Sequence, residues 1–392
     1  MATRGVWQGA VDRIGGEPVS ARMARKAPIR HVDPTLLIAT VALVAFGAVM
    51  ILSATESKQL QAGLDPAFFL KRQIVYAAVA SVVLVIASAV DYKHLRTAAA
   101  PLYVAGVAGL ALVLTPLGTV TGGARRWFNL GFITAQPSEM AKLGVIVALA
   151  ALLAHRKGEV RARDVALCIA AVLAPMALIY LEPDLGTMMI FAALTGALLL
   201  IGGAKVRHFL VLLVLAAGAT LAVLQMGLLE DYQLERITAF MDPTPNVQSE
   251  GYSPFQAKIA IASGGVKGKG IQDRNSQTSL DFVPEQHTDF IFTAVGEQLG
   301  FMGSSVLIVL FGLLIWRALR IAAMSRDLFG SLIASGIAAM WAFQVFVNIG
   351  MTVGIMPITG IPLPFISFGG SSLLTNFACV GLLHNIHMRR FL

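Results

Sequence analysis

Long apolar runs follow one another along almost the whole chain and constrain its fold more than any other feature. Hydrophobic residues make up 56% of the chain and charged residues 13%, whereas soluble domains carry roughly 25% charged residues. About 20 apolar residues span a bilayer as a helix, and the runs lack the alternation of a barrel strand. We therefore predict an all-α integral membrane protein with about ten transmembrane helices, at residues 35–53, 73–90, 98–115, 136–154, 164–181, 185–202, 206–227, 288–316, 328–350 and 368–387.

Charge predicts how these spans are oriented. Most of the 30 lysine and arginine residues fall in the two terminal segments and in alternate connections, Arg96, Arg161 and Arg207 among them. Basic residues accumulate in cytoplasmic connections, so both termini are predicted to be cytoplasmic. The net charge of +8 follows from this topology and from attraction to anionic lipid headgroups, and we expect no nucleic-acid partner.

The chain divides into a short tail and one membrane domain. Residues 1–33 are basic and polar without an apolar core, and we predict a disordered cytoplasmic tail there. Residues 34–392 form a single predicted membrane domain, in which 228–287 is a large extracytoplasmic loop. A short helix is expected around Pro254–Ser263, where it would suit the outer membrane surface.

Polar residues gather in four segments on the predicted outer side, namely Lys71–Gln73, Gly122–Lys142, Glu182–Thr187 and Phe282–Phe292. Each has a structural interpretation beside a functional one. Lys71 and Arg72 suit anchors that snorkel to the interface. Trp127 suits an interfacial aromatic, and Asp184 suits the N-cap of the following span.

The segment "FVPEQHTDFIF" is explained only in part by a helix start. Pro284 and Glu285 suit the first turn of the span that follows. Asp289 comes four residues after Glu285, so both are predicted to project from one helix face. Partial burial and neighbouring charges make Asp289 a candidate base, and Glu297 would lie in the apolar zone, where ionisable groups are usually functional.

Two other outer features suggest substrate contacts. The connection Asn348–Ser372 is apolar but rich in proline and glycine, so a continuous helix is not expected, and the segment is predicted either to be buried by protein or to line a cavity. At its end, Ser371 and its neighbours either simply begin a helix or present backbone N–H groups to an anion. Glu139 and Lys142 stand three apart and are predicted to pair within the membrane along a cavity.

Four long motifs, in the same order as in one known family, resemble the SEDS (shape, elongation, division and sporulation) peptidoglycan polymerases. They are "GARRWFNLGFITAQPSEMAKL", "EPDLGT", "DFVPEQHTDFIFTAVGEQLGFMG" and "NIGMTVGIMPITGIPLPFISFGGSSL". The similarity runs from about residue 35 to 388, and "TGIPLPF" is closer to elongation than to division members. It implies a ten-helix glycosyltransferase that polymerises lipid II at the outer face. By motif position, Asp289 is its catalytic carboxylate, Asp281 a second acidic position and Trp127 a functional aromatic.

The chemistry implied is displacement of undecaprenyl pyrophosphate by a sugar hydroxyl. Asp289 would take the proton, and outer-face cations would stabilise the leaving group. The cationic candidates are Lys71, Arg72, Arg125, Arg126, Lys267, Lys269 and Arg274; the other candidates for the substrate site are Trp127, Glu139, Lys142, Asp281, Glu285, His287 and Ser371. A divalent cation, Mg²⁺ or Mn²⁺, is expected with Asp289 and Asp281 as candidate ligands, and no organic cofactor.

The resemblance also implies partners: a class B penicillin-binding protein transpeptidase, docking through spans eight and nine and the outer loops, and other elongation-complex membrane proteins. The expected location is the bacterial cytoplasmic membrane. A division polymerase and a lipid II flippase are the alternatives, since polar residues in a helical bundle also suit transport. Phe368 departs from the family, in which tyrosine is commoner at that position.

Overall fold

The computed structural model describes residues 31–121, 124–129, 131, 134–156, 160–227, 240, 251–271, 276–280 and 282–390. All ten predicted spans are helical there, and they correspond to α3 (Pro34–Gln61), α4 (Phe68–Ala89), α6 (Ala99–Val113), α7 (Pro137–Ala154), α8 (Ala162–Leu181), α9 (Leu185–Ile201), α10 (Val206–Gln225), α13 (Ile291–Ala323), α14 (Leu328–Val353) and α15 (Gly370–Arg389). Six are long and apolar enough to cross a membrane, and α6, α9 and part of α10 are shorter apolar helices. The chain is a multi-pass membrane protein.

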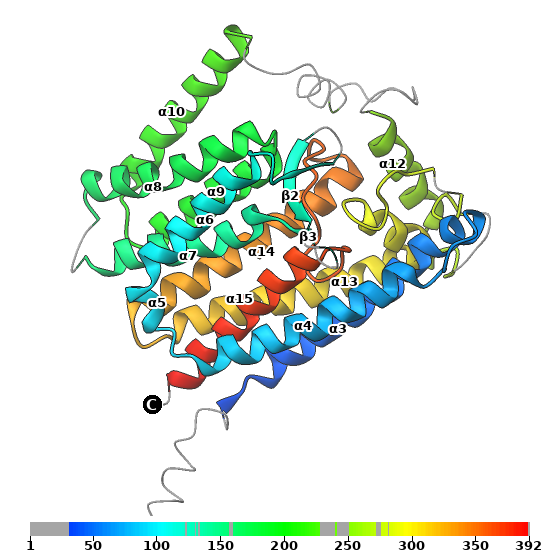
Figure 1. Ribbon diagram of the computed structural model, residues 1–392, viewed down its shortest axis with the longest axis horizontal. Coiled ribbons are helices and arrows are strands. Elements are labelled where there is room, and N and C mark those ends of the chain that lie inside the picture. Colours follow the sequence, from blue (N-terminus) through cyan, green and yellow to red (C-terminus); the bar gives the residue numbers. More distant parts are fainter. Residues whose placement is uncertain are drawn as a thin grey trace, which may run out of the picture.

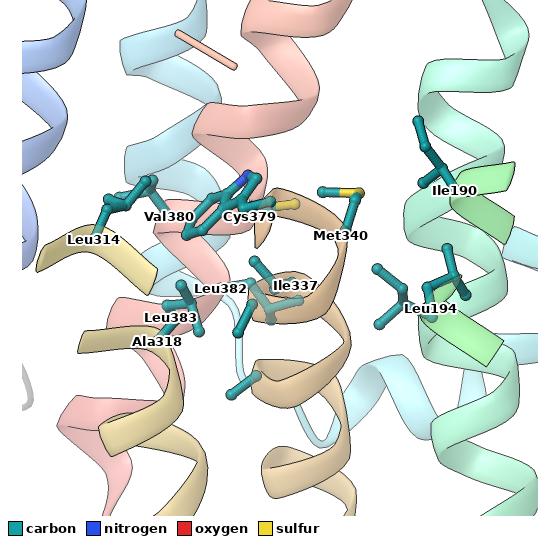
Figure 2. Packing of buried hydrophobic residues seen from close by; sticks show 14 of the residues in the cluster. Ile190, Leu194, Leu314, Ala318, Ile337, Met340, Cys379, Val380, Leu382 and Leu383 are labelled. Atoms are coloured by element: carbon teal, nitrogen blue, oxygen red, sulfur yellow. The ribbon is translucent and has the colours of Figure 1, made fainter. Parts of the chain in front are cut away.

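Helix α14 lies at the centre of the bundle. It packs against α13, α7 and α9 along its length, and α15 packs closely on α4 (Figure 1). In the apolar stretch of α14 that could cross a membrane, 72% is buried inside the protein. Figure 2 shows this core, in which Ile337 and Met340 of α14 lie between Leu194 of α9 and Cys379 of α15.

Capping residues fix where several helices begin. Asp33 accepts hydrogen bonds from the backbone N–H groups of Thr35 and Leu36, with Pro34 at the first position of α3. Asp184 caps α9 through the N–H of Thr187 at 3.0 Å, which confirms that sequence prediction. The N-terminal end of α3 and the C-terminal half of α15 meet, because His384 contacts the carbonyl oxygen of Asp33 at 3.2 Å.

A small antiparallel sheet between α6 and α7 was not predicted. It consists of β1 (Thr119–Thr121), β2 (Ala124–Asn129) and β3 (Thr134–Ala135), in that order. Thr121 pairs with Ala124, and the two glycines between them in the sequence are a hairpin signal. The sheet therefore carries Arg125, Arg126 and Trp127 on a strand rather than on a loop.

Among the described residues, two further helices lie outside the spans. The helix expected around Pro254–Ser263 is confirmed as α12 (Tyr252–Gly264), which packs against α13 and α14. The short α5 (His94–Thr97) precedes α6. The predicted tail up to residue 30 and much of the predicted loop 228–287 lie outside the described residues.

Candidate functional site

The chain just before α13 departs from the sequence prediction. Helix α13 begins at Ile291, so Glu285 and Asp289 lie in consecutive turns before it and not on one helix face, as predicted. Glu285 has a φ of +51°, which a helix cannot accommodate. Its carboxylate instead accepts a hydrogen bond from the Thr288 hydroxyl at 3.1 Å.

Tertiary hydrogen bonds to the backbone carbonyl oxygens of three successive residues, 287 to 289, fix the position of this turn. Phe368 donates its N–H to the oxygen of His287 at 2.9 Å, and the Ser367 hydroxyl donates to the oxygen of Thr288 at 2.5 Å. Asn348 of α14 donates from Nδ2 to the oxygen of Asp289 at 2.8 Å. These partners bond the carbonyls in place of helical N–H groups, which is why α13 starts later than its sequence suggests.

Asp289 lies at the meeting point of this turn and the connection after α14. Asn348 also donates to the oxygen of Ile361 at 2.7 Å, so one side chain joins both segments. Gly360 has a φ of +68°, and a Cβ atom there would lie 3.4 Å from Oδ2 of Asp289. Asp289 is half-buried. Sequence reasoning missed Asn348 as a positioning residue, although an asparagine in an apolar span was a visible signal.

An aromatic group joins α4 to this turn. The ring of His287 lies 4.7 Å from that of Phe69 and 5.8 Å from that of Phe368. Arg72 lies over the ring of Phe68 at 5.4 Å. The phenyl ring of Phe368 packs here as an apolar neighbour.

Arg126 holds the turn between α8 and α9. Its Nε donates to the carbonyl oxygen of Glu182 at 2.7 Å, and its Nη2 donates to that of Pro183. At Gly186, a Cβ atom would overlap the carbonyl oxygen of Thr359, so this turn contacts the connection after α14. The motifs around Arg126, Glu182 and Thr359 therefore meet, as the shared outer side predicted.

Glu182 itself is fully buried at the end of α8. Within the described part of the chain, neither of its carboxylate oxygens has a hydrogen-bond partner. Burial, and secondarily the carboxylate of Asp184, raises its pKa to about 8, against a smaller lowering by Arg126. The side chain is therefore a neutral acid over much of the physiological pH range.

Ser371 connects the small sheet to the start of α15. Its hydroxyl donates to the carbonyl oxygen of Thr134 at 2.8 Å and accepts from the N–H of Gln136 at 2.9 Å. The hydroxyl is thus engaged with protein, and any anion contact here would use backbone N–H groups. Trp127 is half-buried on β2, where its carbonyl oxygen accepts from the Thr119 hydroxyl at 2.9 Å.

The predicted ion pair of Glu139 and Lys142 is confirmed, whereas the cavity that it was expected to line stays a prediction. Lys142 Nζ lies 2.7 Å from Oε1 of Glu139, and the two side chains are 1% and 4% exposed, lysine first. The pair therefore sits in the packed interior of the bundle, near the N-terminal end of α7. A cation this deeply buried requires its carboxylate partner.

Glu297 ties the segment after α12 to α13. Its carboxylate accepts from Lys269 Nζ at 2.8 Å, from the N–H of Gln277 at 2.7 Å, and from both N–H and hydroxyl of Thr278 at 2.8 and 2.6 Å. Lys269 is therefore occupied by Glu297. These contacts give Glu297 a structural role, and the functional role predicted for it stays a prediction.

The remaining candidates differ in what the structure describes. Lys71 forms an ion pair with Asp65 at 2.6 Å with its own side chain 68% exposed, and this contact lowers the pKa of Asp65. Arg125 is exposed on β2. Asp281 and Arg274 lie outside the described residues.

A divalent cation would find few ligands in the described part of the chain. No group of three or more histidine, cysteine, aspartate or glutamate side chains gathers among those residues. Asp289 could supply one carboxylate, and the other candidate ligand, Asp281, lies outside the described residues; a bound phosphate group and water usually complete the coordination of Mg²⁺.

Known proteins are similar in sequence to this chain over most of its length. The family "Cell cycle protein", which groups FtsW, RodA and SpoVE, matches residues 34–391. Peptidoglycan glycosyltransferase MrdB of Escherichia coli strain K12 is 36% identical over 92% of this chain and 94% of the relative. Stage V sporulation protein E of Bacillus subtilis strain 168 is 34% identical over 90% of this chain and 96% of the relative.

Solved structures agree with that similarity. A chain from "Structural coordination of polymerization and crosslinking by a peptidoglycan synthase complex" has a TM-score of 0.77 at 33% identity, covering 92% of this chain and 98% of that one. The rod shape determining protein RodA of Thermus thermophilus has a TM-score of 0.68 at 32% identity, with the same coverage. The shared region includes every element that surrounds Asp289.

Proposed function

The chain belongs to the FtsW/RodA/SpoVE (SEDS) family, and from this premise we propose that it is a peptidoglycan glycosyltransferase. In this proposal it polymerises lipid II into glycan strands at the outer face of the bacterial cytoplasmic membrane. The similarity to MrdB, named a peptidoglycan glycosyltransferase, supports the reaction class. The similarity to a rod shape determining protein supports a role in elongation.

The observation that carries the proposal is the convergence of the outer motifs on Asp289. Asn348 joins Asp289 to Ile361, and the turn at Glu182–Gly186 contacts the same connection at Thr359. Segments far apart in sequence thus support one half-buried carboxylate, as a catalytic group requires.

In the proposed reaction, Asp289 accepts the proton of a sugar 4-hydroxyl. The hydroxyl oxygen forms a bond to the anomeric carbon of the donor while the bond from that carbon to the pyrophosphate oxygen breaks. Single displacement inverts the anomeric centre. The pyrophosphate leaves as an anion, so cationic side chains can replace a strong general acid.

The structure gives protein partners for three of the cationic candidates, of which Lys71 pairs with Asp65. Arg126 and Lys269 bond to protein groups, the first to carbonyl oxygens and the second to Glu297. Arg72, beside the aromatic group at His287, and the exposed Arg125 are the residues we propose for the pyrophosphate, because guanidinium groups suit phosphate oxygens. A divalent cation such as Mg²⁺ or Mn²⁺, held by Asp289 and pyrophosphate oxygens, would add further charge stabilisation.

The partner and topology are also part of the proposal. A solved relative comes from a complex described as coordinating polymerization and crosslinking, which supports a class B penicillin-binding protein partner here. Two spans, α13 and α14, are expected to dock. The apolar stretch that could cross a membrane is 22% buried within the protein in α13 and 72% buried in α14, so α13 offers the contact surface. The meeting of Asp33 with His384 supports two termini on one side, proposed as cytoplasmic.

Purified protein, labelled lipid II in detergent and gel analysis of glycan length test the reaction. We expect polymer from the wild type and loss of at least about 100-fold in Asp289→Asn, because a positioned base contributes roughly 10²–10⁴-fold. Asp91→Asn, which removes a carboxylate at the opposite end of the bundle, should leave polymerisation intact. Polymer from Asp289→Asn at the wild-type rate would refute the base, and lipid II transfer across vesicles without polymer would indicate a flippase.

A further inference from the structure

A polar hollow lies at the end of the bundle opposite Asp289. It has a volume of about 600 Å³, within the range of ligand pockets. The C-terminal end of α7, the N-terminal end of α8 and the turn between α9 and α10 enclose it. Its lining residues are His155, Arg156, Val160, Arg161, Ala162, Asp164, Lys205 and Arg207.

The lining carries an excess of positive charge. Among the described lining residues, four lysine and arginine side chains accompany one carboxylate, that of Asp164, and His155, whose Nδ1 contacts Arg96, lies beside them. Asp164 is already engaged, since Arg156 Nη2 lies 2.7 Å from its Oδ1 and the N–H of Arg161 donates to its Oδ2 at 3.1 Å.

Two basic residues elsewhere at this end of the bundle are paired with carboxylates. Arg317 pairs with Asp33, and Arg389 pairs with Asp91 at 3.0 Å. General accumulation of basic residues on one side of a membrane does not by itself produce a hollow with several cations around one carboxylate. Like charges held together around a cavity favour a bound anion, which would relieve their repulsion.

Helix direction adds to this preference. Helices α8 and α10 both begin at the hollow, at Ala162 and Val206. A helix N-terminus carries partial positive charge and backbone N–H donors that suit phosphate oxygens. The cationic side chains and both helix ends therefore select for the same ligand chemistry, a phosphate group.

An apolar stripe next to the hollow indicates where the rest of the ligand would lie. Val206, Leu210 and Val214 recur at intervals of four along α10 and are 72%, 59% and 70% exposed. The stripe starts at the hollow, and α10 leans away from the bundle in Figure 1. A phospholipid would place its acyl chains there, whereas a free phosphate ion would leave the stripe unused.

We infer that the hollow binds the phosphate headgroup of an anionic phospholipid, whose acyl chains lie along the exposed stripe of α10. Basic pockets between transmembrane helices bind such headgroups. The site is separate from Asp289, so it stands whether or not the proposed polymerase activity is confirmed.

Native mass spectrometry tests this inference. The full-length protein in detergent is mixed with increasing concentrations of dioleoyl phosphatidylglycerol, and the lipid that stays bound after removal of the detergent is measured. The wild type should retain one lipid saturably, and dioleoyl phosphatidylcholine should not compete. In the double variant Arg161→Gln with Arg207→Gln, the apparent affinity should fall about 30-fold, since each cation near a membrane surface contributes about a factor of five. Lysine at both positions should restore most of the binding.

The matched control removes two exposed arginines outside the hollow, Arg163→Gln with Arg326→Gln, and should change affinity less than about twofold. Equal loss in this control, or unchanged binding in the Arg161 and Arg207 variant, would overturn the proposal. A parallel titration with inorganic phosphate distinguishes the source. Displacement of the lipid by millimolar phosphate would assign the hollow to a free phosphate ion and overturn the lipid assignment.

Discussion

Asn348 of α14 and Asp289 are joined by a hydrogen bond from the asparagine Nδ2 to the aspartate carbonyl oxygen, 2.8 Å long. The same Nδ2 serves Ile361. The position of the candidate base thus depends on a side chain that the proposed reaction never touches.

Replacing Asn348 with alanine should therefore lower both stability and activity. Two carbonyl oxygens lose their donor, at a cost of about 1–3 kcal/mol, and Asp289 loses a positional constraint. We expect the thermal midpoint to fall and the rate of lipid II polymerisation per folded molecule to drop at least about tenfold.

Asn376→Ala is the matched control for this variant. Asn376 is a buried asparagine in α15 whose amide accepts from Trp341 Nε1 at 2.7 Å and donates to the carbonyl oxygen of Ser372. It should destabilise the protein to a similar extent while retaining activity per folded molecule. If the two variants lose activity equally, the positioning role of Asn348 is refuted.

Glu297→Ala should loosen the segment after α12. The substitution leaves the N–H groups of Gln277 and Thr278 and the ammonium of Lys269 without their common acceptor, and losing one partner of a buried ion pair costs roughly 3–5 kcal/mol. Hydrogen exchange of residues 276–280 should speed up markedly. Lys269→Met removes only one of these contacts and should have a smaller effect; equal exchange rates in both variants would contradict this account.

The sequence was sufficient to predict the ten helices because span length and apolarity are local properties. Local signals also predicted Asp184 as a cap and the pairing of Glu139 with Lys142, three residues apart. The start of α13 was mispredicted, since Pro284 and Glu285 have the residue types of a helix start. The start is decided by hydrogen bonds from residues 348, 367 and 368 to the carbonyl oxygens of residues 287–289. These donors lie far away in the sequence, so local patterns do not predict the contacts.

The two neighbouring arginines of β2 illustrate the same limit. From sequence, Arg125 and Arg126 were equivalent candidates for a pyrophosphate. Side chains alternate along a strand, so one is exposed and the other reaches the carbonyl oxygens of Glu182 and Pro183. The different directions of the two arginine side chains could be predicted only if the segment had first been recognised as a strand.

The two arginines should consequently respond differently to substitution. Arg126→Lys keeps the charge but cannot span both carbonyl groups, so we expect a lower thermal midpoint with little change in KM for lipid II. Arg125→Gln should leave the thermal midpoint unchanged and raise KM several-fold. Steady-state kinetics and thermal unfolding on both variants separate these effects, and a raised KM with normal stability in Arg126→Lys would reverse the assignment.

Glu182 should make stability depend on pH. Because its pKa is raised to about 8 in the folded protein and is near 4.3 in an unfolded chain, the folded state holds one more proton between those values. Stability therefore falls as pH rises from about 4.3 to 8 and levels off above that. Glu182→Gln mimics the neutral acid, so it should raise the thermal midpoint by several degrees at pH 8.5 and change it little at pH 4.5.

The control for this pH series is Glu285→Gln, which removes an exposed carboxylate and should alter the midpoint equally little at both pH values. Thermal unfolding of the three proteins across this range gives the comparison. A midpoint difference between Glu182→Gln and wild type that stays constant with pH would show that Glu182 does not carry the extra proton. A difference that grows from about pH 4.3 to 8 and then levels off would locate the proton on this buried acid, next to the turn that Arg126 holds.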